Sequence, residues 1–261
     1  SNDFPTTTGA HTTNNPSTGG SNIAGVVFSL DPDLSTLRHS TFVGGGGITA
    51  AYNVEVESDG EIVVSGGTTG NTLPTSTSAW RPNAPGGLAD GFVVRYDSSL
   101  ASVVACSYIG GSMYDQAYFV DIDDDGDVYL AGHVTGSGAV FPELNSSYSE
   151  PLGGQFIIKL DSNFTTPEYV TRFGNGDGDP DLSLTAMLVD ICENVYVSGW
   201  AGNTATLLSG GASSPNPGPG FSHNSPQGGY DTFGSGSAFD NTFSGTGDFY
   251  FFVLETDANS L

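Results

Sequence analysis

Clusters of aspartates come closest, in type and spacing, to a binding motif in this sequence. Asp121, Asp123 and Asp125 alternate ahead of Gly126, as in the opening of a calcium loop. Alternating acids of this kind place carboxylate oxygens around a hard cation. The twelfth position of such a loop is Gly132 rather than a glutamate, so a solvated turn is the competing interpretation.

A second cluster has the same alternation, at Asp177, Asp179 and Asp181, in a loop between two predicted strands. Calcium bound at one of these two clusters is therefore the cofactor that the sequence allows, and it suggests no other.

Signatures of catalysis are scarce. Serines are abundant, but no Gly-x-Ser-x-Gly elbow joins a strand to a helix. Acids from different parts of the chain could still meet at a central channel as a carboxylate pair for glycoside hydrolysis, so a hydrolase is the least favoured function. We expect a protein that is not an enzyme. The four histidines show no zinc-binding spacing and stand at His11, His39, His133 and His223.

A repeat of about 66 residues must position these groups. Its clearest marker is a strand that ends in a small residue and glycine, and Ser65, Ala131 and Ser198 follow one another at spacings of 66 and 67 residues. A period of this length built from strands is typical of propellers, solenoids or arrays. With 38 glycines, 14 prolines and 13% charged residues, the composition favours many short strands joined by turns.

The repeat predicts an all-β fold, a β-propeller of four-stranded antiparallel blades within one domain, 1–261. We expect the four strands of each sequence unit to form one blade, giving three complete blades and part of a fourth. The units are about 22–88, 89–152 and 153–247, and 248–261 begins the next. The predicted strands are 25–31, 38–43, 51–57, 61–68, 91–97, 104–109, 117–123, 127–134, 155–161, 168–174, 184–190 and 194–200.

Tight hairpins are predicted between the third and fourth strands of each unit. Asp59-Gly60 and Asp125-Gly126 are the dipeptides that favour positive φ in such turns. The third unit has residues 190–194 (Asp-Ile-Cys-Glu-Asn) there, so we expect a different turn. An acid recurs at one position of these hairpins, at Glu57, Asp123 and Asp190, which indicates a structural partner of the turn rather than a catalyst.

Aromatic residues recur in the connectors between units, including Trp80 and Tyr148. Each follows a proline-containing segment, and its ring could anchor the crossing to the next blade. Packing is the first interpretation of these rings, and a platform that stacks on sugars is the second.

A net charge of −24 argues against nucleic acid and against anionic membranes as partners, because both require clustered Lys and Arg. No run of residues has the length and apolarity of a membrane helix, and no signal peptide is visible. The two cysteines, Cys106 and Cys192, lie on different repeats and could form one disulfide or stay as two thiols.

The pattern resembles the bacterial extracellular β-propeller repeat (SBBP). The matching segments include Asp90 to Asp97, Tyr108-Ile109-Gly110-Gly111, Asp123 to Gly132 and Asp3-Phe4-Pro5-Thr6-Thr7. Residues 189–200 look like a variant from large surface proteins of Bacteroidota, which the type IX system often exports. The resemblance implies a secreted, non-enzymatic module of a long protein at the cell surface.

An insertion rich in Gly, Ser, Pro and Asn lies within 203–247 of the third unit. Its aromatic residues favour contact with a neighbouring subunit or blade. The sequence therefore predicts a structural and adhesive module of a filament or surface protein, assembling with copies of itself or with other domains of the same chain; the alternative is a propeller that binds surface glycans. The candidate contact residues are Trp80, Tyr148, Phe221, Tyr230, Phe233 and Phe239.

Overall fold

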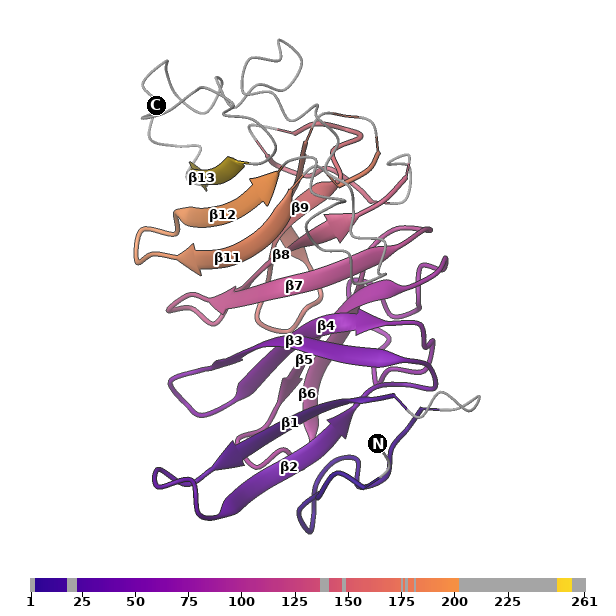
Figure 1. Cartoon of the computed structure of the whole chain (residues 1–261), viewed down its shortest axis with the longest axis vertical. Helices are drawn as coiled ribbons and strands as arrows, with labels where there is room; N and C mark the ends of the chain where they lie inside the picture. The colour runs from indigo at the N-terminus through magenta and orange to yellow at the C-terminus, as the bar shows by residue number, and fades with distance from the viewer. Residues whose placement is uncertain are drawn as a thin grey trace.

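Antiparallel strands make up the regular structure of the chain (Figure 1). The computed structural model describes residues 3–17, 23–136, 141–146, 149–174, 176, 178–180, 182–201 and 248–254. In these residues no helix forms, and hence none that could span a membrane. The strands are β1 (Gly25–Leu30), β2 (Leu37–Val43), β3 (Thr49–Val56), β4 (Ile62–Thr68), β5 (Asp90–Tyr96), β6 (Val103–Ile109), β7 (Asp115–Ile122), β8 (Val128–Val134), β9 (Gln155–Leu160), β10 (Pro167–Phe173), β11 (Ser183–Val189), β12 (Val195–Ala201) and β13 (Asp248–Leu254).

The strand positions agree with the sequence prediction to within about two residues, but the strands are grouped differently. The sheets are β1-β2, β3-β4-β5-β6, β7-β8-β9-β10 and β11-β12-β13. Each four-stranded sheet thus takes two strands from one sequence unit and two from the next. The prediction that one unit forms one sheet is wrong, because the chain leaves the sheet after the second strand of each unit.

The exit from the sheet is a glycine step. At the end of β6, Gly110 has φ of +142°, a conformation that residues with a side chain rarely adopt. The amide of Gly111 then donates a hydrogen bond of 2.7 Å to the buried carboxylate of Asp115, at the start of β7. This capped turn sends the chain across to the next sheet.

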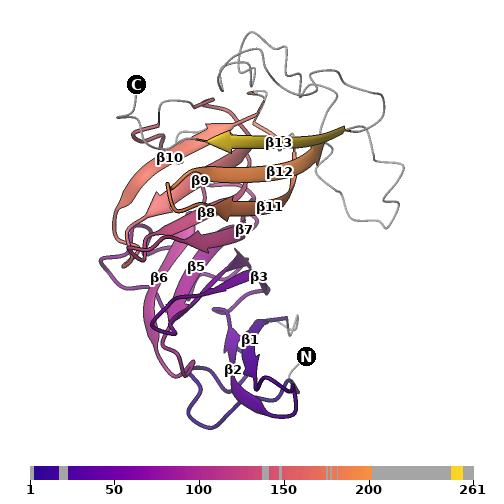
Figure 2. The same cartoon turned by 90° about the vertical axis from the view of Figure 1, so that its left-hand side faces the viewer.

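The described sheets follow one another in a row from β1-β2 to β11-β12-β13, and both views show this order (Figures 1 and 2). Neighbouring residues of one strand point into different cores, as the alternation of a β-strand requires. In β4, Val63 packs toward the β7–β10 sheet and Val64 toward β1-β2. In β8, Leu130 and Ala131 divide in the same way between the sheets on either side.

The central strands of the two four-stranded sheets, β4, β5, β8 and β9, are therefore buried on both faces, and each sheet depends on its neighbours. Strand β7, the first of its sheet, lies against β3, β4 and β5 of the preceding sheet, and β11 lies against β7 and β8. The described strands do not close into a ring.

The repeated motif of β4 and β8 ends in glycine because a backbone carbonyl group and an aromatic ring lie close to the Cα atom at this position. Gly132 pairs with Phe156, and Gly66 pairs with Phe92. A Cβ atom on Gly132 would lie 1.9 Å from the carbonyl oxygen of Gln116 and 2.8 Å from the Phe156 ring. Only glycine fits at this position.

Replacing Gly132 with alanine should therefore lower the free energy of unfolding by about 3 kcal/mol, because backbone and ring must both move. The matched control is Gly111→Ala, where a Cβ atom would meet its nearest neighbour at 3.9 Å. We expect that control to change stability by less than about 0.5 kcal/mol. Urea unfolding of the three proteins tests this, and equal losses in the two variants would contradict it.

Candidate functional site

Three acidic hairpins, β3–β4, β7–β8 and β11–β12, occupy equivalent places in successive sheets. All three turns have the same pair of backbone hydrogen bonds, as in Asp123 N to Asp127 O and Gly126 N to Asp123 O. The prediction of a different third turn is wrong. Glu193 takes the left-handed conformation, with φ of +62°, at the place of Gly60 and Gly126.

The recurring acid is a structural partner of the turn at Asp123 and Asp190, as the sequence predicts, whereas Glu57 forms an ion pair with Arg95 and Asp59 accepts the turn amide of Glu61. Asp123 accepts hydrogen bonds from the amides of Asp125 and Asp127. Asp190 accepts them from the amides of Cys192 and Asn194, and also from the Tyr196 hydroxyl at 2.8 Å.

A buried cation faces the turn in the two four-stranded sheets. Arg95 of β5 forms ion pairs with Glu57 and Glu61. Lys159, at the equivalent place in β9, lies 3.1 Å from the Asp123 carboxylate. The side chains of Arg95 and Lys159 are only 6% and 7% exposed. These cations neutralise acids that would otherwise repel one another in a poorly hydrated place.

The same cations reach the turn of the next sheet. Arg95 Nη2 donates a 2.8 Å hydrogen bond to the carbonyl oxygen of Gly126. Lys159 Nζ donates one of 2.8 Å to Glu193, which also accepts a hydrogen bond from the Tyr129 hydroxyl. Gly126 and Glu193 hold the same position in their turns, so this link between sheets repeats with the sequence.

For Asp127 and Lys159, desolvation and the nearby opposite charges shift the pKa in opposite directions. Desolvation and neighbouring acids raise the pKa of Asp127 to about 6, although Lys159 opposes the rise. Desolvation alone would lower the pKa of Lys159, but its bonds to Glu193, Tyr129 and Asp123 raise it overall. Lys159 therefore stays charged across the physiological range of pH.

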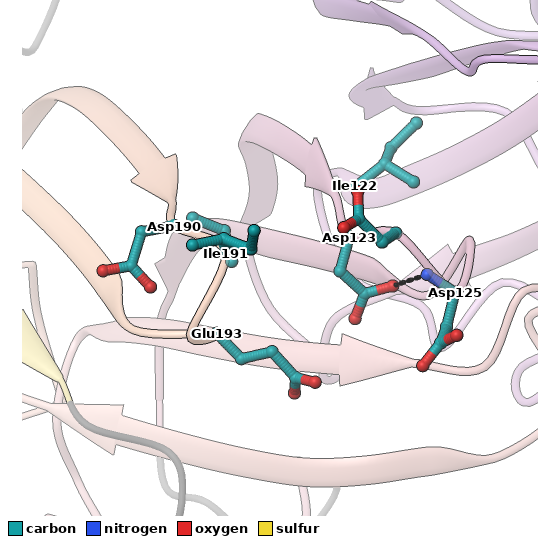
Figure 3. Close-up of a pocket in the computed structure, with 8 residues that line it drawn as sticks. Ile122, Asp123, Asp125, Asp190, Ile191 and Glu193 are labelled. Carbon is teal, nitrogen blue, oxygen red and sulfur yellow. Dashed lines mark hydrogen bonds between the residues drawn. The ribbon is translucent and has the colours of Figure 1, made fainter.

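A cavity of about 190 Å³ separates the turns of β7–β8 and β11–β12 (Figure 3). Carboxylates from both turns line it, and Lys159 lies behind Asp123. Among the described residues, no three of its acids bring ligand oxygens within 4.8 Å of one another, so they do not form a group that could share an ion. The lining residues are Ile122, Asp123, Asp124, Asp125, Val189, Asp190, Ile191 and Glu193.

The candidate calcium residues divide between several places. Asp121 accepts a 2.7 Å hydrogen bond from the amide of Val189 and so links β7 to β11. Asp123 and Asp125 belong to the turn. Asp179 lies beside a separate cavity of about 320 Å³. Asp177 and Asp181 lie outside the described residues.

Three carboxylates of the β3–β4 turn come close enough to share an ion. Within the part of the chain that is described, Glu57, Asp59 and Glu61 of the β3–β4 turn place ligand oxygens within 4.8 Å of one another. Arg95 already neutralises part of this group. This group was not predicted, although the alternation of acids along 57–61 is a signal in the sequence that indicates it.

Among the aromatic candidates, Trp80 uses its ring for packing. The ring contacts Phe141 at 6.5 Å between centroids, and the Arg81 guanidinium lies 4.9 Å from the ring centre. The backbone amide of Trp80 donates to the carbonyl oxygen of Phe164 in the next sheet. The other candidates lie outside the described residues: Tyr148, Phe221, Tyr230, Phe233 and Phe239.

The two cysteines do not pair. Cys106 is buried in β6, and Cys192 is exposed in the β11–β12 turn.

A second group of buried charges lies where β5 and β7 begin. Asp90 and Asp115 are 5% and 0% exposed. Desolvation raises the pKa of Asp115 to about 6, although Arg172 and Arg81 oppose the rise. Desolvation, with the nearby Asp115, raises the pKa of Asp90 from 3.8 to about 7. One oxygen of Asp90 has no hydrogen-bond partner in the described structure.

No family model matches the chain, and no curated protein matches it. The resemblance to the bacterial extracellular β-propeller repeat therefore remains a prediction from the sequence.

Replacing Lys159 with methionine should lower the free energy of unfolding by about 3 kcal/mol, because the buried Asp123 would lose its counter-charge. Lys159→Arg, which keeps the charge, should lose less. Adding Asp123→Asn to Lys159→Met should recover part of the loss. Urea unfolding measures all three, and a double variant no more stable than Lys159→Met would contradict the pairing.

Asp90 should make stability depend on pH. Its pKa is higher in the folded state, so protonation favours folding: this stabilisation is complete below about 3.8 and is lost as pH rises to about 7. Asp90→Asn should therefore be more stable than the native chain near pH 8, by about 2 kcal/mol. Denaturant midpoints near pH 5 and pH 8 measure the difference. Asp124→Asn, in an exposed turn, is the control, and equal pH dependence of Asp90→Asn and the native chain would refute the assignment.

Proposed function

We propose that the chain is a structural and adhesive module of β-propeller type, without catalytic activity, that acts through protein–protein assembly. It would belong to a large secreted protein of the cell surface or to an extracellular filament. The secreted location and export by the type IX system rest on the sequence resemblance alone.

The observation that carries this proposal is the repeated link between sheets. A cation buried in one sheet bonds the turn of its own sheet and the turn of the next, at Arg95 and again at Lys159. Sheets whose central strands are buried on both faces and that share such links form a rigid, extendable body, as repeat proteins do. Rigidity along the repeat is what a structural element of an appendage requires.

The strand order supports the propeller arrangement. Each four-stranded sheet is a simple antiparallel meander, and its last strand leads by a short crossing to the first strand of the next sheet. The first strands, β3, β7 and β11, lie against one another in succession, as the inner strands of propeller blades do.

The alternative, a propeller that binds glycans, needs aromatic faces open to a sugar. Trp80 is half-buried, and its ring packs against Phe141 and Arg81. We therefore place assembly ahead of glycan binding.

The purified chain should form larger species as its concentration rises, and electron microscopy should show regular oligomers or filaments. Calcium, which we propose as the ion of the acidic turns, should promote assembly relative to a chelator. Sedimentation velocity in both buffers measures this. Trp80→Phe, which keeps an aromatic ring, should assemble normally. A chain that stays monomeric in both buffers and binds a glycan array through Trp80 would reject the proposal.

A further inference from the structure

The two-stranded sheet β1-β2 leaves one strand edge open. In the other sheets the strands equivalent to β1 pair on the same side with the second strand of a hairpin: β5 with β4, β9 with β8, and β13 with β12. Among the described residues, β1 pairs only with β2. Its other edge presents a row of backbone N–H and C=O groups that can accept another strand.

The face of β3 beside this edge carries exposed apolar side chains. Val54 and Val56 of β3 are 50% and 65% exposed. Their equivalents in β7 are Val120, which is only 3% exposed, and Ile122, which packs on the core.

A difference in neighbours explains the exposure. Strand β7 lies against β3, β4 and β5 of the sheet before it, whereas on that side β3 meets β1 and β2 (Figure 2). The two strands that would cover Val54 and Val56 are the same two that would continue the sheet beyond β1. The open edge of β1 and the exposed valines of β3 therefore belong to one surface, and a two-stranded hairpin is of the right size to cover it.

A positive charge, that of Arg38, lies beside the open edge of β1, where it could pair with the acidic turn of a docked hairpin. The register of β1-β2 is interrupted at Arg38, just as that of β9-β10 is interrupted at Glu168. Glu168 lies 3.2 Å from Lys159, beside the turn of its sheet. Arg38 is exposed and would stand beside the turn of a hairpin added to β1.

We infer that the edge of β1 and the β3 face beside it form a docking site for a β-hairpin of the same repeat, carried by another stretch of polypeptide. The second strand of this hairpin pairs antiparallel with β1, its apolar residues cover Val54 and Val56, and its acidic turn meets Arg38. The three described hairpins, β3–β4, β7–β8 and β11–β12, fit this description in length, alternation and turn charge. The inference rests on the proposed function, since it names the surface and the partner through which assembly proceeds.

A synthetic peptide of residues 115–134, the β7–β8 hairpin, tests the site. Labelled with a fluorophore and titrated with the full chain, it should show a saturable rise in anisotropy, and a scrambled peptide should not. The double substitution Val54→Lys and Val56→Lys should weaken binding about tenfold or more, because two buried valines contribute several kcal/mol at most and lysines would be desolvated.

Charge variants test the orientation. Arg38→Glu should weaken binding by about threefold, the effect of one partly exposed ion pair. Val104→Lys is the matched control, since Val104 holds the place of Arg38 on β6, is 49% exposed, and belongs to a complete sheet. That control should bind the peptide like the native chain.

Three results would overturn the inference. They are the absence of saturable binding, binding that survives the valine substitutions, and self-association of the chain that needs Val54 and Val56 although the peptide does not bind. The last would assign the site to a different segment of a second copy. Assembly in the sedimentation experiment without peptide binding would remove this inference and leave the proposed function intact.

Discussion

A positive charge buried between two acidic turns is the interaction on which the stacking of sheets depends. The chain has five bases against 29 acids, and it buries three of those bases, Arg95, Lys159 and Arg172. Turns that carry two or more acids each could not approach one another without such a counter-charge. Arg95 and Lys159 thus allow an acidic surface to coexist with closely packed sheets.

The link is directional, and it changes at the last described sheet. Val253 of β13 stands where Arg95 and Lys159 stand in β5 and β9, so this sheet supplies no cation from that position. Its turn instead depends on the preceding sheet, through Glu193 and Lys159, and on Tyr196, which bonds Asp190. The β3–β6 and β7–β10 sheets each supply a cation to the turn of the following sheet, and the β11–β13 sheet only receives one.

Local pattern was enough to place strands β1 to β12, because alternation and the glycine-rich turns are features of neighbouring residues. It was not enough to group the strands. The pairing of β4 with β5 joins segments separated by the long connector 69–89, and nothing in the local sequence distinguishes that pairing from one within the unit. The third turn was also missed, because a glutamate in the left-handed conformation is uncommon and becomes tolerable through tertiary bonds to Lys159 and Tyr129.

For the candidate sites too, the features that are local in the sequence could be predicted, and those that depend on tertiary structure could not. The spacing of the repeat correctly predicts Asp123 and Asp190 as turn partners, but not Glu57, which forms an ion pair with Arg95. The bond from Asp121 to Val189 and the carboxylate group at Glu57, Asp59 and Glu61 depend on how sheets and turns lie in space. Spacing along the sequence cannot specify either one.

Hydrogen exchange of the native chain in low concentrations of denaturant tests most directly whether the buried cations join the sheets into one body. If they do, the central strands β4, β5, β8 and β9 should lose protection together, with one dependence on denaturant. Loss of protection in the β7–β10 sheet while the β3–β6 sheet stays protected would show that the sheets unfold independently, and would contradict the account.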